Sequence, residues 1–561
     1  MGGKRRPGSS VTNNLQKISI ENGYIIGKVR VDCSNLSSKD SYSEGVIENE
    51  LLEIAREGRI SAALHADSRW SVLYHFTEIR ENLLSWLPEN RSKRVLEIGS
   101  GCGAVTGALC RKFGSVDCVE LSERRAEIAA WRWADCDNLT IHVGNLNDMS
   151  FPEKFDCVTL IGVLEYAASF THDTSHPYQD FLLNCRQYLK ETGTLVIAIE
   201  NRIGLKYWAG AWEDHTGDIF DGLLGYPTDR GVRTFSRKEL SNLLDEAGLY
   251  SKEWFYPYPD YKLPSDIYSD RREPTAEEMM NLPNLTFDRE RYEFFSEKAV
   301  MANLLSTGLF SEFSNSFLVL CGGDKRERTA LPLYCHYSPS RKPEYRISTE
   351  IVEENGKRGV RKTALTKEAR KHLITIEENY RILCGIYGSE HVAESHLLSE
   401  DVLEMEYIEG TPMTDLVLSS LREEGIDGLA RQLDFLTSLV PSYPKERLGN
   451  SDSVNHPDRI YDVDLNFDNI IIRNGIYVLI DYEWLLDKVP DRYLEFRCAA
   501  HFSDRYSRDL AGKGISMETL FAGLDIGKKE LKACAEGEVN FTDLVLDPYS
   551  VSYEKKRIDI V

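Results

Sequence analysis

An apolar strand that runs directly into three alternating glycines constrains this chain more than any other feature. The segment reads Val95-Leu96-Glu97-Ile98-Gly99-Ser100-Gly101-Cys102-Gly103, and a helical pattern follows at residues 104–112. Such glycines let the backbone turn sharply without a Cβ in the way of a ligand, and the helix N-terminus behind them offers N–H donors. The next predicted strand ends at Glu120, whose carboxylate can accept a hydrogen bond from each of two ribose hydroxyls. The loop therefore predicts a nucleotide-like cofactor.

The surrounding pattern predicts an α/β fold. Strand patterns at 94–98, 115–120, 139–143, 155–161 and 194–199 alternate with helical patterns at 104–112, 123–134 and 178–189. This alternation is typical of a doubly wound, mostly parallel sheet. We expect residues 315–321 to form its last strand.

Two cofactors fit the glycine loop. The spacing Gly99-x-Gly101-x-x-Ala104 fits a dinucleotide fingerprint. The spacing E-x-G-x-G-x-G, which starts at Glu97, looks like the S-adenosylmethionine loop of class I methyltransferases. A tight strand-to-helix turn without a ligand is the third interpretation.

Residues 94–250 resemble class I S-adenosylmethionine-dependent methyltransferases, with a Rossmann-like sheet. Gly144-Asn145 stands where that family often has Gly-Asp, and residues 155–166 match the fourth-strand motif, whose end faces the methyl group. The resemblance implies that Glu97 lies near the amino-acid part of the cofactor, Glu120 binds the ribose and Asn145 the adenine amine. The implied cofactor residues are Glu97, Gly99, Gly101, Gly103, Glu120 and Asn145.

The segment after the fifth strand is the candidate acceptor site. Residues 200–215 mix charged and aromatic side chains at the carboxyl end of a central strand, where open α/β sheets bind ligands. Glu200 or His215 is a candidate general base. Arg202, Lys206 and Trp208 are candidates for a basic, aromatic pocket that would accept a phosphate. A packed loop with surface ion pairs is the alternative. A long insertion at 257–313, which contains Lys262, is expected on the acceptor side.

A second group of residues suits phosphoryl transfer. Asp464 and Asn469 lie five residues apart, and Asp481 follows at the end of a strand. In phosphoryl transfer one Asp receives the proton of the acceptor hydroxyl, while an Asn and a second Asp hold Mg²⁺. A strand and hinge at 403–410 and a Val-x-Lys at Lys362 lie upstream.

These residues together resemble the protein-kinase-like fold, especially its small-molecule members such as choline and aminoglycoside kinases. The resemblance implies an α+β, two-lobed domain that binds ATP and Mg²⁺. Its implied roles are Asp464 as catalytic residue, Lys362 on the phosphates, Glu406 and Ile408 on the adenine, and Asn469 and Asp481 on the metal. Glu377 or Glu378 would pair with Lys362. Two departures are Asp462 in place of the family's histidine and the segment 338–343 in place of a glycine-rich loop.

We therefore expect an N-terminal extension at 1–60, a methyltransferase domain at 61–325 with its insertion at 257–313, and a kinase-like domain at 333–561. The Gly-led polar stretch at 322–328 reads as the linker between the two domains.

Composition limits the kinds of partner and the location that the chain is expected to have. The net charge of -23 argues against general nucleic-acid binding, because phosphate backbones would be repelled. No apolar run approaches the ~20 residues needed to span a bilayer. Residues 1–14 are basic and polar, so we expect no secretory signal there. The twelve cysteines form no Cys-x-x-Cys pair, which favours a reducing, cytoplasmic location.

A methyltransferase followed by a kinase-like domain resembles bifunctional enzymes that phosphorylate and then methylate the end of bacterial surface polysaccharide chains. That resemblance implies a small-molecule or glycan acceptor and, as partners, proteins of polysaccharide assembly. Two alternatives stay open. Only the methyltransferase is active and the second domain binds a nucleotide, a glycan or a partner, or the chain methylates RNA, which the net charge disfavours.

Overall fold

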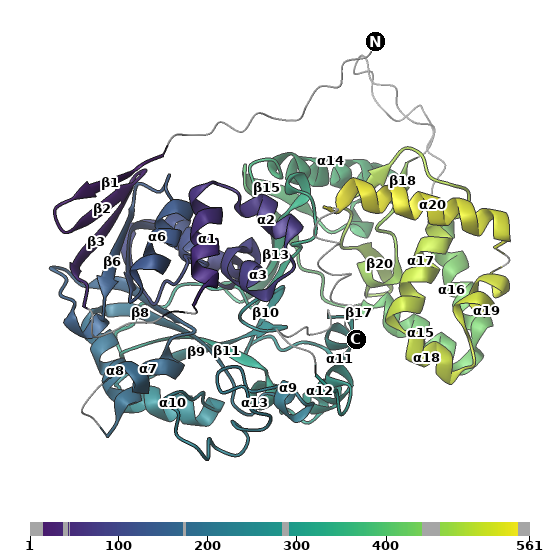
Figure 1. Cartoon of the computed structure of the whole chain (residues 1–561). Coiled ribbons are helices and arrows are strands. Elements are labelled where there is room, and N and C mark those ends of the chain that lie inside the picture. Colours follow the sequence, from purple (N-terminus) through teal and green to yellow (C-terminus); the bar gives the residue numbers. More distant parts are fainter. Residues whose placement is uncertain are drawn as a thin grey trace, which may run out of the picture. The chain divides into compact units, whose positions relative to one another are not determined.

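The computed structural model describes residues 15–37, 43, 45–171, 175–282, 291–439, 460–524 and 526–547 (Figure 1). The expectation about residues 1–14, and parts of those about 257–313 and 333–561, lie outside these residues. The chain forms two compact units. The first comprises Met1–Glu273 and Asn284–Thr329, and the second Pro274–Pro283 and Ala330–Val561.

The first unit is built on a mixed sheet with the order β1-β2-β3-β6-β5-β4-β7-β8-β11-β9-β10. Strands β3, β6, β5, β4, β7 and β8 are parallel to one another, whereas β11 is antiparallel to both β8 and β9. The predicted α/β sheet is therefore confirmed. Its strands are β1 (Lys17–Ile20), β2 (Gly23–Ile26), β3 (Val29–Asn35), β4 (Asn90–Ile98), β5 (Phe113–Glu120), β6 (Leu139–Gly144), β7 (Phe155–Ile161), β8 (Leu189–Glu200), β9 (Ser251–Tyr258), β10 (Asp266–Ser269) and β11 (Ser316–Gly322).

The segment expected as an N-terminal extension adds β1, β2 and β3 to this sheet. Strand β3 lies parallel to β6, with Val31 opposite Ile141, and both side chains are fully buried. Alternate residues of β2 and β3 face the core, because Ile26, Val29 and Val31 are buried while Arg30 is exposed.

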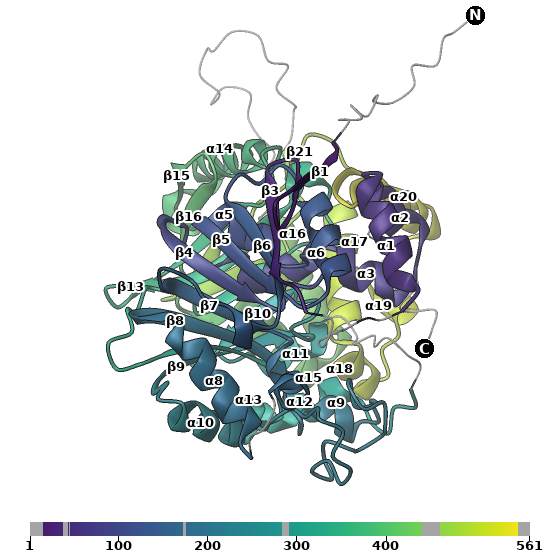
Figure 2. The same cartoon turned by 60° about the vertical axis from the view of Figure 1, so that its left-hand side comes forward.

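Helices cover the sheet of the first unit. The central strands are apolar on both faces, as expected for parallel strands covered on both sides; Val95, Leu160 and Ile197 are fully buried. Helices α8 and α10 lie side by side, as both views show (Figures 1 and 2). The helices are α1 (Ile47–Arg56), α2 (Ile60–Ala66), α3 (Trp70–Phe76), α4 (Asn82–Ser85), α5 (Thr106–Lys112), α6 (Glu123–Arg132), α7 (Ala167–Phe170), α8 (Pro177–Gln187), α9 (Leu205–Trp208), α10 (Arg237–Glu246), α12 (Glu297–Ser306) and α13 (Phe310–Phe313).

The second unit has an antiparallel sheet with the order β12-β13-β14-β16-β15 and one long helix, α14 (Arg370–Tyr387), between β14 and β15. The sheet strands are β12 (Tyr334–Tyr337), β13 (Ile347–Glu354), β14 (Lys357–Ala364), β15 (Ser395–Ser399) and β16 (Val402–Glu406). The shorter strands that follow are β17 (Thr411–Pro412), β18 (Tyr461–Asp462), β19 (Ile470–Arg473), β20 (Ile476–Leu479) and β21 (Leu485–Leu486). A turn at Asn355-Gly356 connects β13 to β14.

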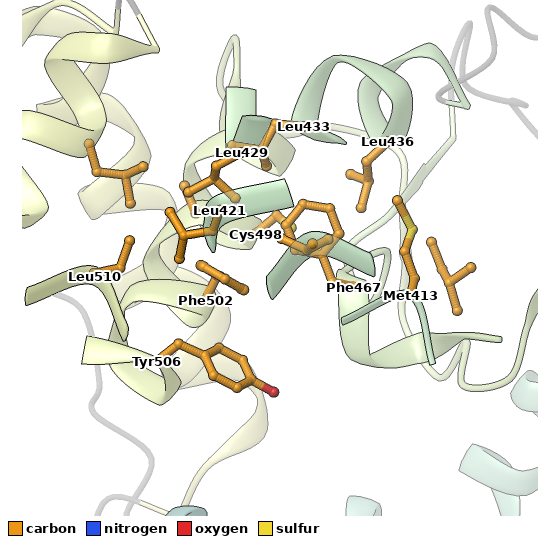
Figure 3. Packing of buried hydrophobic residues seen from close by; sticks show 14 of the residues in the cluster. Met413, Leu421, Leu429, Leu433, Leu436, Phe467, Cys498, Phe502, Tyr506 and Leu510 are labelled. Carbon is orange, nitrogen blue, oxygen red and sulfur yellow. The ribbon is translucent and has the colours of Figure 1, made fainter. Parts of the chain in front are cut away.

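Helices make up the rest of the second unit: α11 (Ala276–Asn281), α15 (Met413–Glu424), α16 (Ile426–Ser438), α17 (Tyr493–Arg505), α18 (Ser507–Gly512), α19 (Met517–Gly523) and α20 (Lys528–Val545). The apolar faces of α15, α16, α17, α18 and α19 pack around Leu421, Leu429, Phe467 and Phe502, each of which is at most 2% exposed (Figure 3). Phe467 and Phe502 meet edge to face, with ring centroids 5.8 Å apart. The loop that carries Phe467 is thereby fixed to a helix core.

Within the residues described, no helix has both the length and the apolar character needed to cross a membrane.

Candidate functional site

The glycine loop between β4 and α5 has the backbone geometry that its sequence predicts. Gly99, Gly101 and Gly103 have φ values of +71°, +55° and +74°, a region that side chains disfavour. A Cβ on Gly99 would lie 2.5 Å from a methyl of Val163, whereas a Cβ on Gly101 would meet nothing within 4 Å. The loop therefore turns tightly against the protein on one side and leaves open space at Gly101.

Glu120 ends the neighbouring strand β5 and contacts this loop. One carboxylate oxygen accepts the Gly101 N–H at 2.7 Å, and the other accepts the Ser122 N–H at 2.9 Å. The side chain is 5% exposed, and burial raises its pKa. Glu120 thus lies at the open position of the loop and already receives two N–H donors.

Glu97 lies beneath the loop. Its carboxylate accepts hydrogen bonds from the Thr106 hydroxyl at 2.7 Å and from the Cys118 thiol at 3.2 Å. Burial raises its pKa to about 7. Glu97 therefore joins β4 to the first turn of α5 and to β5.

Asn145 follows β6, two strands along the sheet from β4. Its side chain is buried, and its amide oxygen accepts the Asn147 N–H at 3.0 Å. The structure thus brings the predicted cofactor residues of three adjacent strands, Glu97, Glu120 and Asn145, to one edge of the sheet, where the carboxyl ends of β4, β5 and β6 lie.

Glu200 and His215, the predicted acceptor-side residues, are in contact. Glu200 ends β8 with no exposed surface, and His215 Nε2 lies 3.3 Å from its Oε2. The Tyr166 hydroxyl lies 2.9 Å from His215 Nδ1. Burial disfavours the imidazolium, but the Glu200 carboxylate raises the pKa of His215 to about 9.

Two further residues belong to this cluster: Glu165 escaped the sequence prediction as a site residue, whereas Lys262 lies in the insertion that was expected on the acceptor side. Glu165, in the short 3₁₀ helix after β7 (Leu164–Tyr166), is 1% exposed and shares a group of nearby ligand atoms with Glu200 and His215. Burial raises its pKa to about 8. Lys262, from the long insertion, lies 2.6 Å from Glu200 Oε1 and also pairs with Asp214. The available signal for Glu165 was its position directly after a central strand.

The cations expected in a basic, aromatic pocket for a phosphate are paired with carboxylates. Lys206 is fully buried and lies 2.9 Å from both Asp214 and Asp260, which neutralise it. Arg202 pairs with Glu239 at 2.7 Å, and Trp208 is half exposed, with its indole N–H on a carbonyl oxygen of its own loop. Each cation expected to bind an anion already has carboxylate partners.

Lys362 lies buried on β14 and binds two acidic residues that follow β20. Its ammonium lies 3.0 Å from Asp481 Oδ1 and also pairs with Glu483. Arg341 and His372 contact the same Glu483 carboxylate at 2.5 and 3.0 Å. Lys362 and Asp481 are therefore brought together as predicted, and Glu483 is an added acidic residue between three basic groups.

The expected helix partner of Lys362 is wrong. Glu377 accepts the Leu397 N–H and pairs with Arg381, and Glu378 is exposed. The buried face of α14 presents His372 and Asn379 instead, and the Asn379 amide donates to the carbonyls of Tyr482 and Glu483.

The loop around Asp464 is held by its own polar groups. Asp462, which replaces the family's histidine, accepts the Asp464 N–H at 3.0 Å, and Asn469 donates to the Asp464 carbonyl at 2.9 Å. Asp464 Oδ2 accepts the Trp484 N–H at 3.0 Å. Burial, together with the negative charges of Asp481 and Glu483, raises the pKa of Asp464 to about 8.

The predicted hinge follows β16. The Glu406 side chain pairs with Arg473 at 2.5 Å, and its N–H donates to the Glu394 carbonyl. Ile408 is buried and packs with Ala393 and Val478. This segment connects the sheet of the second unit to its helices.

Part of the first unit is similar to known methyltransferases. Residues 96–195 match the family model described as "Methyltransferase domain". The demethylmenaquinone methyltransferases of two Tropheryma whipplei strains, Twist and TW08/27, are 30% identical over 106 residues, which is 19% of this chain and 41% of theirs. The chain thus spans about two fifths of the length of these relatives.

Two solved structures illustrate the wider similarity. A chain from the complex between the Haloferax volcanii Trm112 methyltransferase activator and a putative methyltransferase is 18% identical, with a TM-score of 0.29; the match covers 49% of this chain and 97% of that one. A putative methyltransferase from Bacillus halodurans C-125 is 17% identical, with a TM-score of 0.26, and the match covers 44% and 99%. The family-model match and the parallel sheet together support a Rossmann-like methyltransferase fold for residues 96–195 of the first unit.

Proposed function

We propose that the first unit binds S-adenosylmethionine at the glycine loop and transfers its methyl group to a small-molecule or glycan acceptor. The observation that carries this proposal is the open space at Gly101 beside the Glu120 carboxylate. A ribose with two hydroxyl donors fits a carboxylate at that place, and the exposed backbone of a glycine lets the ligand approach.

The buried acidic residues and His215 supply the acceptor side. In the proposed reaction, the acceptor attacks the methyl carbon, the sulfur–carbon bond breaks, and the acceptor's proton passes to His215, which acts in its neutral form because an imidazolium cannot accept a proton. The 3.3 Å separation of Glu200 and His215 supports this role, because a buried carboxylate stabilises the imidazolium that forms. The surrounding carboxylates favour a neutral hydroxyl or amine over an anion.

For the second unit we propose a kinase-like phosphotransferase that uses ATP and Mg²⁺. Lys362 lies on the third strand of its sheet and contacts Asp481, as the phosphate lysine and metal aspartate of such enzymes would. The donor set also fits the ion, because carboxylate and amide oxygens of Asp481 and Asn469 are ligands that Mg²⁺ prefers. Asp464 would receive the proton of the acceptor hydroxyl.

The two activities together suit an enzyme of bacterial surface polysaccharide synthesis. The alternative is that only the methyltransferase is active and the second unit binds a nucleotide or a partner. The contacts of Glu483 favour inactivity of the second unit. Its carboxylate binds Arg341, Lys362 and His372, the basic groups that a nucleotide phosphate would otherwise contact.

Calorimetry with the whole chain separates these possibilities. We expect S-adenosylhomocysteine to bind and NAD not to bind; tight NAD binding would contradict the methyltransferase proposal. A second titration measures the binding of Mg-ATP. A separate assay then measures whether ATP is consumed when each of a panel of sugars is added as acceptor. Failure to bind Mg-ATP at millimolar concentration would contradict the kinase-like proposal, and binding without consumption would favour the alternative.

A further inference from the structure

Glu165 has no role in the function proposed above, yet it is buried against the residues that do. One ligand atom from each of Glu165, Glu200 and His215 lies within 4.8 Å of the other two. Glu165 and Glu200 are 1% and 0% exposed, and the His215 side chain is 6% exposed. We propose that these three residues, called here the Glu–His cluster, form a binding site for a divalent transition-metal ion.

A polar atom inside the cluster has no partner. Glu165 Oε2 is buried and makes no hydrogen bond within the described residues. A buried carboxyl oxygen without a hydrogen-bond partner is expensive, because its lost hydration is not replaced. A bound cation would satisfy that oxygen, which is why this observation indicates a ligand and not only a group of acidic side chains.

The distances fit an ion after a small side-chain movement. Zinc lies about 2.0–2.2 Å from nitrogen and oxygen ligands, so two ligands of one tetrahedral ion are about 3.3–3.5 Å apart. His215 Nε2 and Glu200 Oε2 are 3.3 Å apart. The ligand atom of Glu165 lies within 4.8 Å of the other two, so a small side-chain movement brings it to such a spacing.

Groups around the cluster orient two of the ligands. The Tyr166 hydroxyl at 2.9 Å from Nδ1 can accept the second ring N–H of His215, the arrangement that metal-binding histidines usually have. Lys262 holds the other oxygen of Glu200 at 2.6 Å, and Asp214 shares the charge of that ammonium. Glu200 Oε2 therefore stays directed at His215, where the ion would lie.

The ligand set selects the class of ion. Imidazole favours Zn²⁺ and neighbouring transition metals, while carboxylates also accept Mn²⁺. The site lies where the methyl acceptor is proposed to bind. An ion there would bind an acceptor oxygen directly, and His215 would then be a ligand instead of a base. The metal site does not require the proposed methyl transfer to be correct.

Manganese and zinc binding test the inference without measuring activity. The whole chain carrying Asp481→Asn is used as the parent, because this substitution removes the metal carboxylate proposed for the second unit. Mn²⁺ is titrated by electron paramagnetic resonance and Zn²⁺ by calorimetry. We expect one ion per chain, and at least about tenfold weaker binding after Glu165→Gln or Tyr166→Phe, since even orienting partners change metal affinity by about 10–100-fold.

Glu81→Gln is the matched control. Glu81 is also buried with one unpartnered oxygen, but it pairs with Arg111 and belongs to no cluster of metal ligands in the described residues. Its substitution should leave metal affinity unchanged. The inference is overturned if neither ion binds at millimolar concentration, or if Glu165→Gln binds as tightly as the parent while thermal melting shows both to be folded.

Discussion

Substitution of Glu120 tests the cofactor site most directly, because this carboxylate has two separable roles. It accepts the N–H groups of Gly101 and Ser122, and it is proposed to accept two ribose hydroxyls. Glutamine has the same shape but only one acceptor oxygen. In Glu120→Gln one N–H therefore faces an NH₂ group instead of an acceptor.

The expected magnitudes follow from these contacts. A buried N–H left without an acceptor costs about 1–3 kcal/mol. Glu120→Gln should lower the free energy of unfolding by about that amount, and Glu120→Ala, which removes both acceptors, by more. In Glu120→Ala, loss of the charged acceptor should also weaken binding of S-adenosylmethionine by about 1.5–3 kcal/mol, roughly 10–150-fold.

Urea unfolding measures the first effect, and calorimetric titration at a temperature where every variant is folded measures the second. Glu123→Gln is the matched control, because Glu123 is exposed at the start of α6. The reasoning is refuted if Glu120→Ala folds and binds S-adenosylmethionine with the affinity of the unmodified chain.

Three other predictions concern separate parts of the chain. Burial raises the pKa of Glu97 from 4.5 to about 7, so the fold loses stability as pH rises from 4.5 through 7. Urea unfolding should show that Glu97→Gln gains about 2.5 kcal/mol over the unmodified chain from pH 5 to 8, and a constant difference would contradict this. Asp481→Asn should weaken Mg-ATP binding, whereas Asp464→Asn should lower ATP consumption and leave binding nearly intact; equal binding by both would argue against the assigned roles. Phe502→Ala should lower unfolding free energy by about 3–5 kcal/mol, measured by urea unfolding against exposed Phe435→Ala, because its ring fills the core around Phe467.

The sequence was most informative where structure depends on local pattern. The strands around the glycine loop could be predicted because apolar runs and turns recur along the chain. The pairing of β3 with β6 could not, since it joins Val31 to Ile141 across more than a hundred residues. Local spacing suggested Glu377 or Glu378 for Lys362, but the buried face of α14 follows His372, Ile376, Asn379 and Leu383 at helical spacing.

In the candidate sites, too, features set by a local motif could be predicted, and features set by distant contacts could not. The glycines and Glu120 could be predicted because one short motif contains their chemistry. The neutralisation of Lys206 by Asp214 and Asp260, and of Lys362 by Glu483, depends on side chains that only the folded chain brings together. The charged residues in the sequence therefore indicated which segments contribute to a polar site. They did not indicate which cations are already paired with a carboxylate and which can bind a ligand.

Helix α11 has a consequence for how this polypeptide is made. It belongs to the second unit although it is encoded within the first, and Glu277 at its start accepts a hydrogen bond from Tyr506, 229 residues later. On the ribosome this helix emerges long before the rest of its unit exists. During synthesis the helix therefore has no folded unit to pack against. A gene cut at residue 332 would place the helix and the rest of its unit on different polypeptides. Recombination could not exchange the two units as independent modules without carrying this short segment along.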